Sequence, residues 1–358
     1  MASDQSASKT QSTGLLAVGL GRLGARWGVG AMAGCIWHSE ARSVQAIIES
    51  MSNAYAFASS QDLSWSSVPN PNRAELEDFD IAVDWEASLD STNVRLLAAP
   101  WPRAEAFQGQ QPLVRCLVAD HQSVGRGRAG KVWHDEPGAS LLMSVSIDRK
   151  TQPWPSDLSA FSLVTAVCVA ERLESTGPVD GRRLWLKWPN DVVRFQATDE
   201  GLAKLVGILI EARQHAGQSR LVIGLGINLL PPRNDVSGPK SLPADGLFSR
   251  TLQSVQTLDR AWRLAIAKQL SHDLLGAWID FEAMGLALFA HRIRSRDALF
   301  GRPLLIHDEK QDHGLEALGQ GLDERGRLLV LCQRAATEAP CIVAISEGSV
   351  RLRHQHKA

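Results

Sequence analysis

Apolar positions recur with two different spacings between residues 75 and 296, and together they point to a layered fold. Short apolar runs predict strands, and apolar positions repeated every three or four residues predict helices. The predicted strands cover 113–119, 141–147, 184–187, 206–211 and 221–229, and the predicted helices cover 158–174 and 258–289. Ser156 or Asp157 is placed to cap the first of these helices. The mixture predicts an α/β (α+β) fold with a mostly antiparallel or mixed sheet.

The pattern changes after residue 296, where only short strands are expected. They cover 303–307, 314–322, 328–332 and 342–352, and turn residues such as those at 323–326 separate them. This spacing predicts a small β-barrel of about 55 residues. A module of that size is near the lower limit for independent stability, so we expect it to pack on a neighbour.

Residues 1–74 differ from the remainder because they are rich in Gly, Ala and Ser, and 66–73 resemble a linker. They contain a GxGxxG motif at 19–24. A dinucleotide site needs a complete βαβ unit, and none fits before the linker. We therefore expect a poorly ordered extension, whose role the sequence leaves open.

Composition excludes several classes of protein. The 38 lysines and arginines are balanced by 39 aspartates and glutamates, so a protein-wide basic field for nucleic acid is absent. The five cysteines contain no CxxC pair, which favours a reducing compartment over disulfides or a zinc site. Arg22 and Arg26 interrupt the longest apolar stretch, 15–37, which argues against a membrane span or secretion signal. We expect a cytoplasmic protein without membrane association.

The first motif that carries chemistry is QSVGRGRAGKVW, from Gln122 to Trp133, directly after a predicted strand. Its glycines let the backbone wrap around a ligand and present N–H groups, and its cations can neutralise a carboxylate and phosphates together. The spacing also fits a P-loop, but Val132 stands where Ser or Thr would bind Mg²⁺. A solvated basic loop that touches RNA is the other alternative, and the balanced charge and absence of interleaved aromatic residues disfavour it.

Three further motifs are weak when each is considered alone. Lys187 begins KWPND at a predicted strand end, where its ammonium either points into a site or flanks a simple turn. The next motif consists of two segments, KLVGILIE (204–211) and GLGIN (224–228), whose glycines let the backbone approach a ligand or merely pack. DSTN (90–93) predicts a cap for a helix over 94–99, and free N–H groups at a helix start also bind anions.

Taken in order, these motifs resemble those of the biotin–protein ligase family: STN, GRGRxGxxW, KWPND, KxxGILxE and GIN. The resemblance runs from about residue 75 to 285, and EGSVRLR at 347–353 resembles the end of that family's C-terminal domain. It implies a catalytic domain like that of class II aminoacyl-tRNA synthetases over 75–290. It also implies a small SH3-like β-barrel over 296–355, with 1–74 as an extension.

The resemblance implies that biotin and ATP form biotinyl-5′-AMP, with Mg²⁺, and that biotin passes to a specific lysine of a biotin carboxyl carrier protein or carboxylase domain. The implied biotin contacts are Ser91, Thr92, Asn93, Gln122, Arg126, Gly127, Arg128 and Lys187. The implied ATP contacts are Gly125, Arg128, Lys131, Trp133, Lys187, Asn190 and Asn228, with Asn228 near Mg²⁺. Arg126, Arg128 and Lys187 would be catalytic, because the biotin carboxylate must attack an anionic phosphate.

One departure and several alternatives remain. Many family members carry an N-terminal winged helix and act as repressors, but residues 1–74 show neither a basic stripe nor a pair of amphipathic helices, so we expect no DNA binding.

A lipoate or octanoate ligase is the nearest alternative function, although members of that family carry an RRxSGGG-like loop in place of the GRGR loop. A ligand-sensing module without catalysis is the other, and the retained Lys187 and loop arginines disfavour it. Homodimer formation, the acceptor carboxylase and the group that accepts the lysine proton are open, with Asp191 a candidate for the last.

Overall fold

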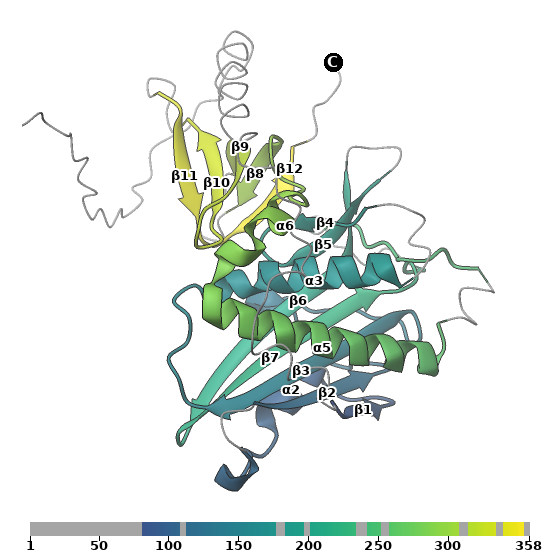
Figure 1. Cartoon of the computed structure of the whole chain (residues 1–358). Helices are drawn as coiled ribbons and strands as arrows, with labels where there is room; N and C mark the ends of the chain where they lie inside the picture. The colour runs from purple at the N-terminus through teal and green to yellow at the C-terminus, as the bar shows by residue number, and fades with distance from the viewer. Residues whose placement is uncertain are drawn as a thin grey trace, which may run out of the picture. The chain divides into compact units, whose positions relative to one another are not determined.

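The computed structural model describes residues 81–107, 112–176, 183–196, 201–233, 242–251, 258–307, 314–333 and 339–353. The expectations for 1–74, including the glycine motif and the linker, lie outside these residues. Within them the chain forms two sheets, one of seven strands and one of five (Figure 1).

The larger sheet is mixed, as the sequence predicts. Its strands are β1 (Val83–Glu86), β2 (Leu113–Ala119), β3 (Ser140–Lys150), β4 (Trp185–Lys187), β5 (Asp191–Phe195), β6 (Leu202–His215) and β7 (Gln218–Asn228). They are paired in the order β1-β2-β3-β7-β6-β5-β4. The β1–β2 pair is parallel, and the other neighbouring pairs are antiparallel. Sequence reasoning missed β1 and β5, which are short and lie at or next to the edges of the sheet.

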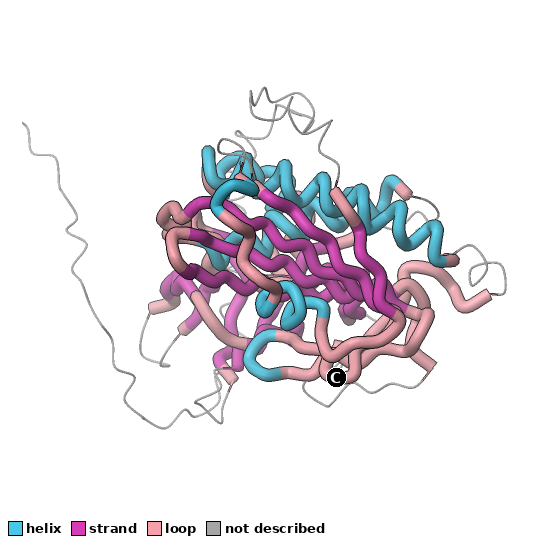
Figure 2. Tube along the Cα trace, turned by 90° about the horizontal axis from the view of Figure 1, so that it is seen from below, coloured by secondary structure: helices cyan, strands magenta, loops and turns pink. Residues whose placement is uncertain are grey.

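Helices cover both faces of this sheet. They are α2 (Thr92–Ala98), α3 (Phe161–Ser175), α5 (Arg260–Met284) and α6 (Ala290–Arg294). Short 3₁₀ turns occur at Ala104–Ala106, Arg128–Gly130, Leu158–Ala160 and Leu286–Phe289. Figure 2 shows the two long helices, α3 and α5, on one face and a short helix with loops on the other. None of the helices in the described ranges is both long and apolar enough to cross a membrane.

The alternation along β2 explains this two-sided arrangement, because neighbouring side chains of a strand point to opposite faces. Cys116 and Val118 belong to the large core that includes residues of α3 and α5. Leu117 belongs to a smaller cluster with Leu96 of α2. Both faces of the sheet are apolar at β2, so apolar residues dominate this strand on either side of Arg115.

The predicted helix caps need correction. Asp157 precedes the 3₁₀ turn, but its side chain makes no capping hydrogen bond, and its backbone carbonyl accepts from Ala160 N at 2.7 Å instead. The helix predicted over 94–99 begins at Thr92, and Ser91 also caps nothing with its side chain. The Oε1 atom of Gln122 accepts from Thr92 N at 2.7 Å, so a residue distant in sequence takes the place of a local cap.

The second sheet is antiparallel and follows α6. Its strands are β8 (Pro303–His307), β9 (Leu315–Leu322), β10 (Leu328–Cys332), β11 (Cys341–Ile345) and β12 (Ser349–Leu352), paired in the order β11-β10-β9-β8-β12. The single strand expected over 342–352 is wrong. Gly348 has a φ of +133°, which interrupts the segment, and β11 and β12 lie at opposite ends of the pairing order.

Asp297, between α6 and β8, provides a stability prediction. Burial raises the pKa of its carboxyl from 3.8 to about 6, although the backbone N–H groups of Leu299 and Phe300 oppose the rise. Asp297 therefore lowers the stability of the folded chain progressively as pH rises from about 4 to about 6, where the unfolded chain loses this proton and the folded chain retains it. Asp297→Asn cannot ionise, so we expect it to exceed wild type in stability above pH 6, by at most about 3 kcal/mol. Denaturant unfolding at several pH values tests this, and an equal pH dependence in both proteins would contradict it.

Candidate active site

A cavity of about 1120 Å³ opens between α2, the glycine loop, strands β4 to β7 and the segment that leads into β12. Ligand pockets for one drug-sized molecule usually measure about 300–1,000 Å³, so this cavity has room for a small acid and a nucleotide together. The sequence-predicted residues that line it are Ser91, Thr92, Asn93, Gln122, Arg126, Gly127, Arg128, Lys131, Trp133, Lys187, Asn190 and Asn228. Gly125 is the exception, because it is buried beneath Trp133 and is absent from the lining.

A buried polar network forms one end of the cavity, at the start of α2. The Oε1 atom of Gln122 accepts from Thr92 Oγ1 at 3.1 Å as well as from Thr92 N. Ser144 Oγ of β3 lies 2.7 Å from Thr92 Oγ1 and 2.6 Å from Asn93 Oδ1. Thr92 and Asn93 are each 3% exposed, and Ser144 is fully buried. This end presents neutral donors and acceptors that their own partners hold in place.

Asn93 extends this network to the glycine loop. Its Nδ2 donates to Leu209 O at 3.2 Å and to Glu211 Oε2 at 2.9 Å. The other carboxylate oxygen of Glu211 lies 3.4 Å from Arg126 NH1. A Cβ atom on Gly224 would lie 2.1 Å from Asn93 Oδ1, so β7 needs glycine there.

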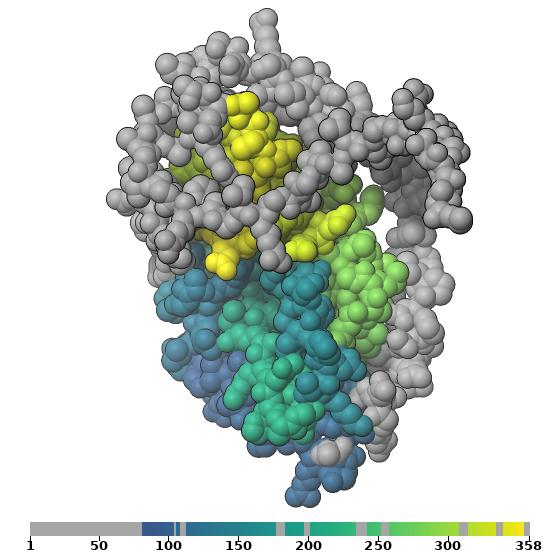
Figure 3. All heavy atoms as spheres, turned by 90° about the vertical axis from the view of Figure 1, so that its left-hand side faces the viewer, coloured from purple at the N-terminus to yellow at the C-terminus, as the bar shows by residue number. Residues whose placement is uncertain are grey.

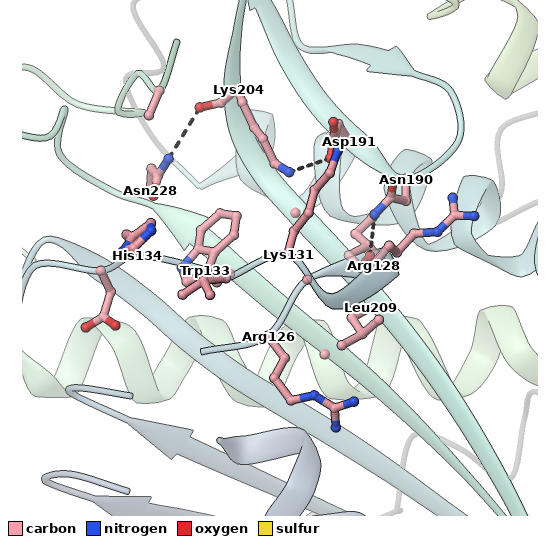
Figure 4. Close-up of a pocket in the computed structure, with 18 of the residues that line it drawn as sticks. Arg126, Arg128, Lys131, Trp133, His134, Asn190, Asp191, Lys204, Leu209 and Asn228 are labelled. Carbon is pink, nitrogen blue, oxygen red and sulfur yellow. Dashed lines mark hydrogen bonds and ion pairs between the residues drawn. The ribbon is translucent and has the colours of Figure 1, made fainter. Parts of the chain in front are cut away.

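The glycine loop is a hairpin, and the backbone N–H groups of Gly127 and Trp133 are paired within it. Trp133 N donates to Gly125 O at 2.9 Å, and Gly127 N donates to Lys131 O at 2.7 Å. Ala129 and Gly130 at its tip have φ values of +53° and +72°, as in a two-residue type I′ turn. The hairpin brings its basic side chains to the cavity, and Figure 4 shows Arg126 and Arg128 extending away from the Lys204–Asp191 pair.

Trp133 fixes the base of this hairpin on a platform of two glycines. Gly207 of β6 and Gly226 of β7 are directly paired across the strands. A Cβ atom would lie 2.6 Å from the Trp133 ring at Gly207 and 2.5 Å from it at Gly226. Lys204 Nζ lies 5.3 Å from the centre of the same ring, a distance at which an ammonium is attracted to the aromatic face.

Lys187, Asp191 and Lys204 form a charged cluster in the cavity, and Figure 4 shows the Lys204 ammonium beside the Asp191 carboxylate. Asp191 Oδ1 lies 2.7 Å from Lys204 Nζ, and Asp191 Oδ2 lies 4.0 Å from Lys187 Nζ. Burial lowers the pKa of Lys187, and the charges of Lys204 and Lys131 lower it further against the effect of Asp191. Burial alone would raise the pKa of Asp191, but Lys204 and Lys187 outweigh it and hold that pKa below its ordinary value.

This cluster has two chemical consequences. Burial is the main cause of the lowered pKa of Lys187, and the cavity also holds more positive than negative charge around it, so an anionic ligand would favour the charged ammonium. Asp191 is a poor proton acceptor near neutral pH, because its pKa is held low by two ammonium groups. The suggestion that Asp191 takes the proton of the acceptor lysine is therefore disfavoured.

Hydrogen bonds also hold the side-chain amides of Asn190 and Asn228 in the cavity. Asn190 Nδ2 donates to Ile208 O at 2.6 Å, and Asn228 Nδ2 donates to Lys204 O at 3.3 Å. The described residues contain no group of three or more His, Cys, Asp or Glu side chains that could hold a metal ion. Mg²⁺ keeps several waters and is usually held by one or two side-chain oxygens plus substrate phosphates. The side-chain oxygen of Asn228 in the cavity suits an ion that arrives on a nucleotide, whereas the Asp191 carboxylate lies beside two ammonium groups.

Sequence reasoning missed four contributions to the site. Ser144 lies inside an apolar run, and Glu211 and Lys204 stand out in the sequence only as the two ends of the KxxGILxE motif. Glu347 to Arg351, just before and within β12, also line the cavity, far in sequence from the other motifs. Lys204 had a detectable signal, because it precedes Gly207 within a strand that carries the platform. The others depend on contacts between distant segments.

Ser144 gives a prediction with an internal control. We expect Ser144→Ala to weaken binding of the ligand at the α2 end about 5- to 10-fold, because buried Thr92 and Asn93 lose a hydrogen-bond partner. Ser146, two positions along β3, is equally buried, and its Oγ has no hydrogen-bond partner among the described residues. Ser146→Ala should therefore change ligand affinity less than twofold. Calorimetric titration of both variants measures this, and equal losses would show that the network has no specific role.

Known proteins resemble this chain over the same residues. Residues 103–228 match the family model described as the Biotin/lipoate A/B protein ligase family, a range that contains the glycine loop, Lys187 and Asn228. The chain is 32% identical over 245 residues to the Bifunctional ligase/repressor BirA of Escherichia coli strain K12, covering 68% of this chain and 67% of that protein. It is 29% identical over 195 residues to the Biotin--[acetyl-CoA-carboxylase] ligase of Mycobacterium tuberculosis, covering 51% of this chain and 66% of that protein.

A solved structure shares the arrangement of elements. The biotin protein ligase from Aquifex aeolicus in complex with biotin and ATP aligns with a TM-score of 0.52 and 25% identity. The alignment covers 76% of this chain and 99% of that chain. The mixed α/β architecture is thus shared with a protein that binds an acid and a nucleotide together.

Proposed function

This chain belongs to the biotin–protein ligase family, and from that premise we propose that it joins biotin and ATP into biotinyl-5′-AMP and transfers the biotin to a lysine of a carrier protein. One observation carries the proposal most. A single cavity combines a neutral polar end, formed by Thr92, Asn93 and Gln122, with a cationic side formed by Lys187 and Lys204. The two parts of the cavity suit the two halves of a biotinyl adenylate.

The α2 end is assigned to the biotin ring system. The ureido group of biotin offers N–H donors and a carbonyl acceptor, and the buried network presents hydroxyl and amide partners that are already oriented. Ser91, Thr92, Asn93 and Gln122 are proposed as its contacts. Arg126, Gly127 and Arg128 of the hairpin are proposed to cover the ligand, because both arginines are exposed and their guanidinium groups are not buried in the fold.

The cationic side is assigned to the reacting groups. The biotin carboxylate attacks the α-phosphate of ATP, and pyrophosphate leaves, so negative charge accumulates where Lys187 lies. A fixed ammonium in a buried site stabilises that charge without reorganising, and Lys131 and Lys204 add to the field. When bound, Mg²⁺ supplies further positive charge to the phosphates, with Asn228 as the proposed contact.

The nucleotide is assigned to Arg128, Lys131, Trp133, Lys187, Asn190 and Asn228. Trp133 supports this assignment because its ring lies on the glycine platform and lines the cavity. Gly125 is withdrawn as a direct contact, since it supports the Trp133 backbone from below. In the second half-reaction the ε-amine of the carrier lysine attacks the mixed anhydride carbonyl, AMP leaves, and an amide forms. No enzyme nucleophile is needed.

Finer features of the fold and partners extend this proposal. We assign 75–290 to a catalytic domain like that of class II aminoacyl-tRNA synthetases and 296–355 to an SH3-like domain, consistent with the separate five-stranded sheet. The partner is a biotin carboxyl carrier protein or carboxylase domain, and a homodimer remains compatible. Absence of DNA binding stays a prediction, and it matters because the Escherichia coli relative carries the description ligase/repressor.

Pyrophosphate release from Mg-ATP by the purified chain tests the reaction and its acid. We expect pyrophosphate release when biotin is added. We expect no release when lipoate is added or when no acid is added. Release with lipoate alone would favour the lipoate branch of the same family. If neither acid caused pyrophosphate release but biotin still bound measurably, a module that senses biotin without catalysis would be favoured instead.

A further inference from the structure

Lys187 lies between two residues that are each bonded to the C-terminal part of the chain. On one side, Leu186 N donates to Arg296 O at 2.8 Å, and Ala298 N donates to Leu186 O at 2.9 Å. On the other side, the Nε1 atom of Trp188 donates to Gly326 O at 3.0 Å. Residues 296–298 therefore extend the edge of β4, and a turn of the second sheet holds the residue that follows Lys187.

Residues 296–298 are firmly attached at this edge. The Arg296 guanidinium donates to both carboxylate oxygens of Glu174, at 2.8 and 2.7 Å, and to Leu184 O at 2.9 Å. Glu174 in turn accepts from Leu184 N at 2.6 Å. Arg296 is 9% exposed, so this paired network is largely shielded from water. The start of β4 is thereby fixed to the end of α3.

The turn that accepts the Trp188 bond is equally well defined. It joins β9 to β10, and its Gly326 has a φ of +73°. A Cβ atom there would lie 2.8 Å from the Cβ atom of Ala160, so the turn sits closely against the beginning of α3. Asp323 stiffens it by accepting from Arg325 N at 3.0 Å and from Arg327 N at 2.8 Å. Figure 3 shows C-terminal strands (yellow) next to residues from the middle of the chain (teal).

The Lys187 side chain itself has weaker local restraints. Its Nζ is 4.0 Å from Asp191 Oδ2, too long for a hydrogen bond, whereas Lys204 takes the close position at 2.7 Å. Lys187 is nevertheless only 7% exposed, so neighbouring atoms enclose its side chain. The position of its ammonium therefore depends mainly on where its backbone is held.

We propose that Trp188 is a positioning residue for Lys187, and that its bond to Gly326 lets the C-terminal sheet set the place of the Lys187 ammonium in the cavity. This inference rests on the proposed function, in which Lys187 stabilises the charge that develops during adenylation. Displacement of a catalytic group by about 1 Å can cost about 10²-fold in rate, so a partial release of the backbone produces a measurable effect.

Trp188→Phe removes the Nε1–H donor and keeps an aromatic ring. We expect single-turnover adenylation to slow about 5- to 10-fold, while the KM values for biotin and ATP change less than twofold. Trp185→Phe is the matched control, since Trp185 lies in β4 three residues before Trp188, packs its ring against Phe195 and is outside the cavity lining. It should leave the rate within twofold of wild type. An equal rate for wild type and Trp188→Phe would overturn the proposal.

The effect of Trp188→Phe in a chain that already carries Lys187→Ala distinguishes a role in positioning Lys187 from a general loss of structure. If Trp188 acts through Lys187, Trp188→Phe causes no further loss when Lys187 is already Ala. A similar fold loss in both backgrounds would mean that Trp188 supports the structure generally, and the proposal would be wrong.

A second readout does not depend on catalysis. Competitive acetylation followed by mass spectrometry measures the reactivity of the Lys187 amine, which should change at least threefold in Trp188→Phe and not in Trp185→Phe. Unchanged reactivity would contradict the positioning role. Absence of biotin-dependent pyrophosphate release by wild type would contradict the proposed function alone, and the acetylation result would still decide the inference.

Discussion

Lys187→Ala is expected to slow formation of biotinyl-AMP by about 10²-fold or more, because one fixed charge at a reacting centre typically contributes that much. The KM for biotin should change little, since the α2 network and not this ammonium holds the ring system. The substitution should also be tolerated by the fold. Asp191 keeps Lys204 at 2.7 Å, and a buried ammonium with a lowered pKa contributes little stability of its own.

Rapid-quench measurement of the first turnover tests this expectation. Lys150→Ala is a suitable control, because Lys150 is an exposed residue at the end of β3 and lies outside the cavity. A change within twofold for Lys187→Ala would remove Lys187 from the chemistry. A large rise in the biotin KM with an unchanged rate would reassign Lys187 to binding.

Two glycines of β7 are expected to separate the binding of the two substrates. A Cβ atom on Gly224 would collide with Asn93 at 2.1 Å, whereas a Cβ atom on Gly226 would collide with the Trp133 ring at 2.5 Å. Such overlaps cost about 1–3 kcal/mol, or roughly 5- to 150-fold in affinity. Gly224→Ala should therefore raise the KM for biotin, and Gly226→Ala should raise the KM for ATP.

Each variant serves as the control for the other, since both add one methyl group to the same face of the same strand. Steady-state kinetics with each substrate varied in turn give the two KM values. If both variants raised both KM values by similar factors, the division of the cavity into a biotin end and a nucleotide end would be wrong. Thermal unfolding checks that each variant remains folded.

The sequence predicts much of this fold because its strands are strongly apolar. β2, β8 and β10 match the expected ranges, and the ligase assignment from four motifs is confirmed by the family relationship. The boundary errors have local causes. Gly348 divides a segment that reads as one strand, and Gln122 supplies the partner that a local cap would otherwise provide.

Most of the chemistry-bearing residues were also identifiable, but their mutual support was not. Ser144 occurs within a buried strand and resembles any small core residue until β3 is placed beside α2. Likewise, nothing near Lys187 in the sequence indicates that Arg296 and Gly326 hold its neighbours. The contacts of Ser144 span 51 and 52 residues. Those of Leu186 and Trp188 span more than a hundred residues, and only the folded structure brings the segments together.

The most direct test of the central claim is the mass of a purified biotin carboxyl carrier domain after incubation with this chain, biotin and Mg-ATP. We expect one biotinyl group to be added to the carrier when ATP is present, and none to be added when the acceptor lysine of the carrier is replaced by arginine. An unmodified carrier lysine, despite a folded chain and both substrates, would contradict the assignment of this chain as a biotin–protein ligase.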